Sequence, residues 1–267
     1  IHVIGTVHLD DSRLDAITQR LAPLITAADL VFLEANEAEE TKLKEAVATR
    51  PDVMFIREGP TLLEQMGKED WAKLAKAAEA RGIPAFVAAK FQPWYLSLML
   101  GMPPCVLSQM AQGIHGLDHR VRDVATSAGV PVLALEPWDT LFSIFGQDPM
   151  EEQIEMLKIG ITSVETAENA VATLMAQYFD QDHGAVMDTS RVALRDTLDM
   201  DRAEFDAVFD DMLDSLLTQR NLKWMTVLDK TRADNIVVAV GAGHLSGENG
   251  VLNLLAQRGY TLTRMAV

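Results

Sequence analysis

Two short turns, one near each end of the chain, restrict the fold more than any other feature of the sequence. Each turn reads Gly-x-x-His-Leu, at residues 5–9 and 241–245. Both follow an apolar run typical of a strand, and a helical stretch follows each of them. In open α/β sheets, the turns after parallel strands lie at one edge of the sheet, where ligands bind. The repeated turn therefore predicts an α/β fold that brings His8 and His244 together.

Further apolar runs predict additional strands, separated by stretches with helical periodicity. Strands are expected at residues 29–35, 83–91 and 130–135, and a short closing strand at 259–265. Strands that alternate with helices indicate an α/β fold, here with a mixed, largely parallel sheet and helices on its faces. Glycine and proline are rare between about 149 and 232. We therefore expect one domain over residues 1–267, with an inserted helical layer at 149–232.

Four of the expected strands end in a side chain that can bind a metal or carry a proton. These side chains are His8, Glu34, Glu136 and His244, and Lys90 ends a fifth strand. Two imidazoles and two carboxylates suit zinc, manganese, cobalt or iron. A bound ion would activate water and polarise a carbonyl without a Ser or Cys nucleophile. Without a metal, a histidine would act as general base, with a carboxylate fixing its tautomer.

Each candidate also has an ordinary structural interpretation. A single histidine after a strand is more often structural, but the repeated motif favours function for His8 and His244. Glu34 and Glu136 would otherwise cap a helix or pair with an arginine. Asp118 lies where a helix over 119–128 should begin, so it is expected to be that helix's N-cap. His119, on the first turn, is a weaker functional candidate.

Charge and composition exclude several classes of partner. The net charge of −16 opposes nucleic-acid binding, which needs a basic face. No stretch of about 18 apolar residues is present, so no transmembrane helix is expected. The single cysteine, Cys105, excludes an internal disulfide and cysteine-based metal sites. The chain begins with Ile1 inside an expected strand, which suggests a processed chain.

The motifs together resemble those of the TraB/PrgY/GumN family, which is related to the Tiki proteins. The resemblance rests on residues 5–9 and 240–252, followed by Gly259-Tyr260. It extends to three internal segments: Gly116-Leu117-Asp118, residues 129–136, and Arg220-Asn221-x-x-Trp224. It therefore covers nearly the whole chain. The wider superfamily is similar to erythromycin-esterase-like and ChaN-like proteins.

The resemblance implies roles for five residues. His8 and His244 match the two histidines of the family's proposed active site, and Glu34 and Glu136 match its acidic positions. Arg220 would hold a carboxylate or a developing oxyanion, because its guanidinium is planar and always charged. Tiki members are described as metal-dependent proteases. The resemblance thus implies a metal-dependent hydrolase, above all a peptidase, that uses Zn, Mn or Co on a peptide or small-molecule substrate.

Two alternatives remain open, because family membership does not settle the reaction. ChaN-like relatives bind haem, so the chain would instead be a non-catalytic protein that binds a peptide or, as the weaker cofactor alternative, haem. Such a pocket would draw on Phe91, Trp94, Tyr95, Met99 and Met102. The other alternative is metal-free hydrolysis of the esterase type. GumN-like relatives often carry export signals, so a periplasmic or exported location is expected.

Overall fold

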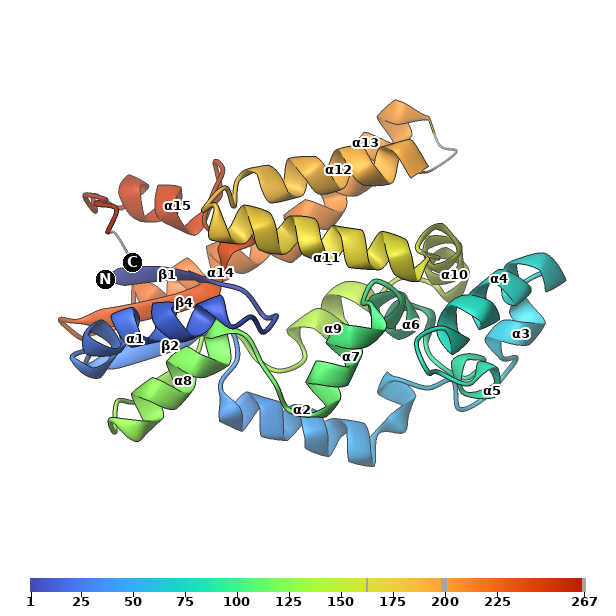
Figure 1. Cartoon of the computed structure of the whole chain (residues 1–267), viewed down its shortest axis with the longest axis horizontal. Coiled ribbons are helices and arrows are strands. Elements are labelled where there is room, and N and C mark those ends of the chain that lie inside the picture. Colours follow the sequence, from blue (N-terminus) through green and yellow to red (C-terminus); the bar gives the residue numbers. More distant parts are fainter. Residues whose placement is uncertain (162, 198–200, 266–267) are drawn as a thin grey trace. The chain divides into compact units, whose positions relative to one another are not determined.

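The computed structural model describes residues 1–161, 163–197 and 201–265 (Figure 1). Its strands are β1 (His2–Thr6), β2 (Leu30–Leu33), β3 (Val132–Ala134) and β4 (Ile236–Gly241). The helices before β3 are α1 (Arg13–Thr26), α2 (Glu37–Thr49), α3 (Leu62–Gln65), α4 (Lys68–Glu79), α5 (Ala85–Ala88), α6 (Pro93–Leu100), α7 (Pro104–Ala111) and α8 (Leu117–Ser127). The helices after β3 are α9 (Thr140–Phe145), α10 (Met150–Ile159), α11 (Val164–Phe179), α12 (Ala185–Thr197), α13 (Arg202–Leu213), α14 (Gln219–Leu228) and α15 (Val251–Gln257). Short 3-10 turns lie at Pro51–Val53 and Ala242–His244, and a π-helical turn at Asp214–Thr218 joins α13 to α14.

The chain divides into two compact units. Unit 1 comprises Ile1–Glu39, Ile114–Pro137 and Ala176–Val267, and unit 2 comprises Glu40–Gly113 and Trp138–Met175. The sheet and the predicted site residues His8, Glu34, Glu136, Arg220 and His244 belong to unit 1. Lys90 belongs to unit 2, as do the residues of the expected peptide or haem pocket, which are Phe91, Trp94, Tyr95, Met99 and Met102. The described part of the expected insertion at 149–232 is largely helical, as its composition predicts. The prediction of a single domain stays a prediction.

Unit 1 is built on a sheet whose described strands run in the order β1-β4-β2-β3. Every described pair is parallel, with Val3 opposite Val238, Val31 opposite Val237, and Phe32 opposite Leu133. The α/β prediction is confirmed, and the sheet, expected to be mixed, is parallel throughout these pairs. Because all four strands run in one direction, their carboxyl ends share one edge.

The two faces of the sheet are covered by different helices. Side chains alternate between the faces of a strand. On one face, α14 and α15 pack against the sheet in a core that comprises Leu30, Phe32, Leu135, Trp224, Met225, Leu228, Ile236, Val238, Val240, Leu245, Val251, Leu254 and Leu255. Helix α8 contacts β2 and β4 and lies beside α1 in front of the sheet (Figure 1). Strands β2 and β4 are buried on both faces, which explains why they read as continuous apolar runs.

Unit 2 is helical where a strand was expected. Residues 85–88 form the short helix α5 instead of a strand over 83–91. Pro84 is the N-cap of α5, and Ala88 is buried in a core shared with α3, α4, α6 and α10. The run is therefore apolar because a helical core buries it. Lys90, on this segment, does not follow a strand of the sheet.

The expected strand at 259–265 is also absent. Gly259 has φ +89 and follows the end of α15. The segment beyond it forms no ladder and leaves Tyr260, Leu262 and Met265 exposed by 46–59%. The apolar side chains of this segment are therefore not buried against another element. Separately, no helix in the described part of the chain is long and apolar enough to cross a membrane.

Candidate functional site

Four predicted site residues meet at the carboxyl edge of the sheet, and a fifth, Arg220, joins three of them. Glu34 follows β2, Glu136 follows β3, and His244 ends the turn after β4. Arg220 reaches all three from α14 and is only 8% exposed. The sheet topology thus brings together side chains that are more than a hundred residues apart in sequence.

Arg220 uses all five of its N–H groups within this cluster. Nε donates to Glu136 Oε2 at 2.9 Å, and Nη2 donates to Glu136 Oε1 at 2.6 Å and to Glu34 Oε2 at 2.5 Å. Nη1 donates to Leu216 O at 3.0 Å and meets His244 Nε2 at 3.1 Å. A guanidinium has five donors and no acceptor. Arg220 therefore holds carboxylates, as expected, and has no donor left for an oxyanion in this arrangement.

The two glutamates accept further hydrogen bonds from their surroundings. Glu34 Oε1 accepts the Gly241 N–H at 2.7 Å, and Glu136 Oε2 accepts the indole N–H of Trp224 at 3.0 Å. Burial by itself raises the pKa of Glu34, but nearby His8, His244 and Arg220 and the Gly241 N–H outweigh it. The pKa of Glu34 consequently lies below its usual value, and the side chain is a carboxylate at neutral pH.

The neighbours of His244 fix its tautomer. The Asn221 amide nitrogen donates to two backbone oxygens, at 2.9 Å to Asn249 and 3.3 Å to His244 itself. Asn221 Oδ1 therefore faces His244 Nδ1, 2.7 Å away, and Nδ1 must carry the hydrogen. The Nε2 lone pair accepts from Arg220, which is always protonated. Burial lowers the pKa of His244, and the charge of Arg220 lowers it further. The charge of Glu34 raises this pKa but does not outweigh them, so the pKa falls to about 4.

His8 occupies a different environment from its counterpart. Its side chain is 63% exposed, and its Nδ1 lies 3.2 Å from Asp118 Oδ2. Desolvation of the ring lowers the pKa of His8. The hydrogen bond and charge of Asp118 and the charge of Glu34 raise this pKa more, to about 9. Burial alone would raise the pKa of Asp118, but the hydrogen bonds and charges of His119 and His8 keep it well below its usual range. His8 and Asp118 form an ion pair at neutral pH.

Gly116 brings Asp118 to His8. The Gly116 N–H donates to His8 O at 3.1 Å, and the Leu117 N–H donates to Val7 O at 2.9 Å. A Cβ on Gly116 would lie 1.9 Å from Val7 O, so only glycine allows this approach. Gly116 is also the N-cap of α8, which places Asp118 inside the first turn. The prediction that Asp118 is the N-cap is wrong, because the close contact with His8 starts the helix earlier.

Gly241 and Tyr178 support the two Gly-x-x-His turns. A Cβ on Gly241 would lie 3.2 Å from Glu34 Oε1 and 3.8 Å from His8 Nε2, so these two groups flank the second turn. Tyr178, from α11, donates its hydroxyl to Gly5 O at 2.9 Å. Gly241 thus lets the backbone approach the side chains of the predicted site closely.

The arrangement of donors does not fit a divalent ion bound by His8, His244, Glu34 and Glu136. The lone pair of His244 and both oxygens of each glutamate already accept hydrogen bonds. A fixed guanidinium charge at the centre opposes a second cation. The described residues contain no group of three or more His, Cys, Asp or Glu side chains arranged for a metal. The metal prediction therefore gains no support from this geometry.

The sequence interpretation missed or undervalued three residues that hydrogen-bond to the predicted site residues. Asp118 was interpreted as a cap, and Asn221 and Trp224 were noticed only as part of a family pattern. A signal was present, because Arg220, Asn221 and Trp224 recur at helical spacing and so share one face of α14. Of the other histidines, His115 stacks on His119, and His183 bonds to Ser246.

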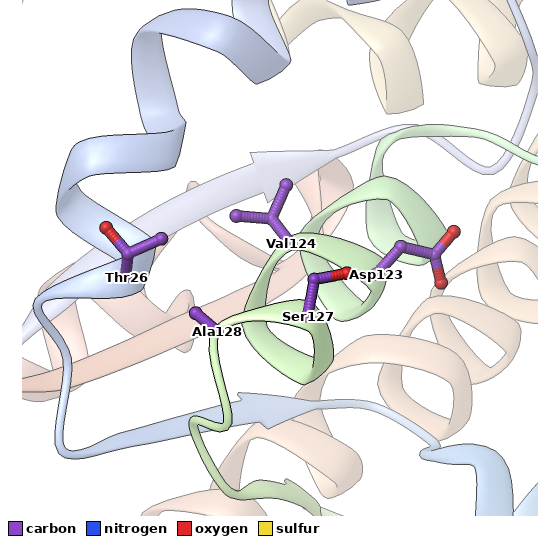
Figure 2. Close-up of a pocket in the computed structure, with 5 residues that line it drawn as sticks. All are labelled: Thr26, Asp123, Val124, Ser127 and Ala128. Atoms are coloured by element: carbon purple, nitrogen blue, oxygen red, sulfur yellow. The ribbon is translucent and has the colours of Figure 1, made fainter.

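A shallow hollow elsewhere in unit 1 is separate from this edge. Figure 2 shows its lining residues, which are Thr26, Asp123, Val124, Ser127 and Ala128. They lie at the last turns of α1 and α8, whereas Asp118 lies at the first turn of α8. A helix rises about 1.5 Å per residue, so the α8 residues that line the hollow lie about 7.5 to 15 Å along the helix axis from Asp118.

The fold and the site define an α/β protein with a histidine–arginine–carboxylate cluster at the carboxyl edge of a parallel sheet. The sequence pattern of the TraB/PrgY/gumN family matches residues 1–264, and the chain belongs to this family. It is 22% identical over 256 residues to the uncharacterized protein YbaP of Escherichia coli (strain K12), and equally to YbaP of Shigella flexneri. Each alignment covers 95% of this chain and 87% of the relative. No solved structure matches the chain.

Proposed function

We propose that this protein is a hydrolase of amide or ester bonds in which His8, oriented by Asp118, transfers protons to and from water and substrate. The carrying observation is the contrast between the two family histidines. His244 is buried and has both ring nitrogens engaged, whereas His8 is 63% exposed and directs one nitrogen to Asp118. Only His8 therefore offers an accessible ring for proton transfer.

The proton transfers follow from this geometry. With Nδ1 donating to Asp118, the neutral His8 ring carries its lone pair on Nε2. Nε2 takes a proton from water as the oxygen attacks the substrate carbonyl, and Asp118 stabilises the imidazolium that forms. The imidazolium then returns the proton to the leaving amine or alkoxide. Atoms and charges balance without a covalent enzyme intermediate.

Arg220 acts in this scheme by holding the site together. It fixes Glu34 and Glu136 and keeps His244 neutral through Nε2. Glu34 in turn adds negative charge near His8, which favours the imidazolium. Such fixed groups need little rearrangement during the reaction, and this preorganisation lowers the barrier.

Peptides are the first substrate class to test, because Tiki relatives are described as proteases. The finer expectation of a metalloprotease is not part of the mechanism, since Arg220 donates to His244, Glu34 and Glu136. The fourth expected ligand, His8, is paired with Asp118. Esters form the second class, because the same proton transfers serve both bonds.

The test combines activity with metal dependence. The purified chain is assayed on quenched-fluorescence peptides and on activated esters, with EDTA and separately with added Zn²⁺, Mn²⁺ or Co²⁺. We expect cleavage that EDTA leaves unchanged and that His8→Ala abolishes, while His2→Gln, at the opposite end of β1, retains it. Activity that appears only with an added metal, or survives His8→Ala, would overturn the mechanism; absence of cleavage throughout would overturn hydrolysis.

A further inference from the structure

Two imidazoles share one oxygen of Asp118. His8 Nδ1 lies 3.2 Å from Asp118 Oδ2, and His119 Nδ1 lies 3.0 Å from the same atom. Both rings therefore face the carboxylate with the same nitrogen. His119 is the neighbour of Asp118 on the first turn of α8, and its own ring stacks on His115 with centroids 3.9 Å apart.

The second oxygen of Asp118 provides no additional support. Oδ1 is buried and accepts no hydrogen bond from any residue that the structure describes. The two imidazoles thus supply all the hydrogen bonds that the described residues make to this carboxylate. A carboxylate held at one oxygen by a single donor can turn about its side-chain torsion, whereas two donors on the same oxygen fix its direction.

We propose that His119 is a positioning residue that holds Asp118 in the direction required to orient His8. His119 touches neither water nor substrate in this role, and acts only through Asp118. The stack on His115 sets the plane of the His119 ring, so the chain 115–119 forms a rigid support behind the exposed histidine. The inference rests on the proposed function for its kinetic consequence, but its geometric content stands separately.

Two substitutions separate the hydrogen bond from the ring. His119→Phe keeps a flat ring for the stack on His115 but removes the donor to Asp118. His119→Asn keeps an N–H near the place of Nδ1 and removes the ring. Thermal unfolding of both variants first establishes that they fold, and crystal structures then give the distance from His8 Nδ1 to Asp118 Oδ2.

We expect the Phe variant to lose the close contact between His8 and Asp118, and the Asn variant to retain it. On a substrate cleaved by the wild type, kcat of the Phe variant should fall about tenfold to a hundredfold with KM within twofold, because misplacing a catalytic group by about 1 Å has an effect of this size. The Asn variant should recover most of kcat. A stacking role alone would give the opposite order of the two variants.

The failure of this inference can be distinguished from failure of the proposed function. An unchanged contact between His8 and Asp118 in His119→Phe, or a kcat equal to that of the wild type, overturns the positioning role. If the wild type cleaves nothing, the hydrolase proposal fails, and the two crystal structures alone decide whether His119 positions Asp118.

Discussion

Asn221 Oδ1 lies 2.7 Å from Nδ1 of His244, and this one contact assigns the tautomer of the buried histidine. It leaves the lone pair on Nε2, where Arg220 donates to it. The two histidines of the repeated motif are therefore not equivalent. His244 is a neutral part of a buried hydrogen-bond network, and His8 is an exposed, charged group paired with Asp118.

Replacing Arg220 should destabilise unit 1 strongly. Arg220→Lys keeps the charge but cannot supply five donors in a plane, so Glu34 and Glu136 would be left buried and underbonded. Breaking a buried ion pair costs about 3–5 kcal/mol. Urea unfolding should show a loss of this size. Arg232→Lys, a matched change at an exposed arginine that bonds only nearby backbone oxygens, should change stability by less than about 0.5 kcal/mol.

Asp118→Asn should remove activity while the fold is retained. The amide is isosteric with the carboxylate, but it no longer stabilises an imidazolium on His8 and can present its own N–H to Nδ1. We expect kcat to fall by about 10²–10⁴-fold, the usual range for disabling acid–base catalysis. Asp123→Asn, on the same helix but 67% exposed, is the control and should keep full activity. Equal activity of the two variants would remove Asp118 from the mechanism.

The hydrolysis rate should rise with pH up to about 9. The reactive form of His8 is the neutral ring, and its pKa of about 9 leaves about one ring in a hundred neutral at pH 7. Below pH 9, kcat/KM should therefore increase about tenfold per pH unit and then level off. Glu34→Gln removes one charge that raises this pKa, so its profile should level off at lower pH. A profile that is flat between pH 7 and 9 contradicts the role of His8 as base.

The stability of the protein should decrease as the pH falls from 6.5 towards 4. In this window an unfolded histidine takes up a proton, but folded His244, with a pKa of about 4, does not. Proton uptake by the unfolded state lowers the free energy of unfolding, by at most about 1.4 kcal/mol per pH unit for one group. Denaturant titrations should show this slope. His244→Gln should reduce it, and an unchanged slope would mean that His244 is protonated in the folded protein.

Gly116→Ala should disturb both stability and activity. The added Cβ would lie 1.9 Å from Val7 O and 2.5 Å from the His8 carbonyl carbon, so the start of α8 must move away from the His8 turn. That movement separates Asp118 from His8. The control is Gly67→Ala, whose Cβ meets nothing within 4 Å and whose φ of −63 suits alanine. The midpoint temperature of thermal unfolding and kcat should both drop in Gly116→Ala and stay near the wild-type values in Gly67→Ala.

The sequence predicts the strands of the sheet better than it predicts the periphery of the fold. Strands β2 and β4 were recognised because burial on both faces makes them apolar throughout. Strands β1 and β3 are only partly buried, and Leu133 of β3 is 47% exposed. The prediction of a strand at 83–91 was wrong because a short helix buried in unit 2 is as apolar as a buried strand. The prediction of a strand at 259–265 was wrong because alternating apolar and polar residues form no strand without a neighbouring backbone to pair with.

The sequence by itself determined the family, the α/β class and the identity of His8, His244, Glu34, Glu136 and Arg220 as candidate site residues. Only the tertiary structure decided what those residues do to one another. The spacing of two histidines and two glutamates is compatible with a metal site, but Arg220 donates from α14 to His244 and to both glutamates. Asp118 acquired its place beside His8 because Gly116 allows two backbones to touch. Hydrogen-bond partners depend on distances of a few tenths of an ångström between segments far apart in sequence, and only the packed chain sets those distances.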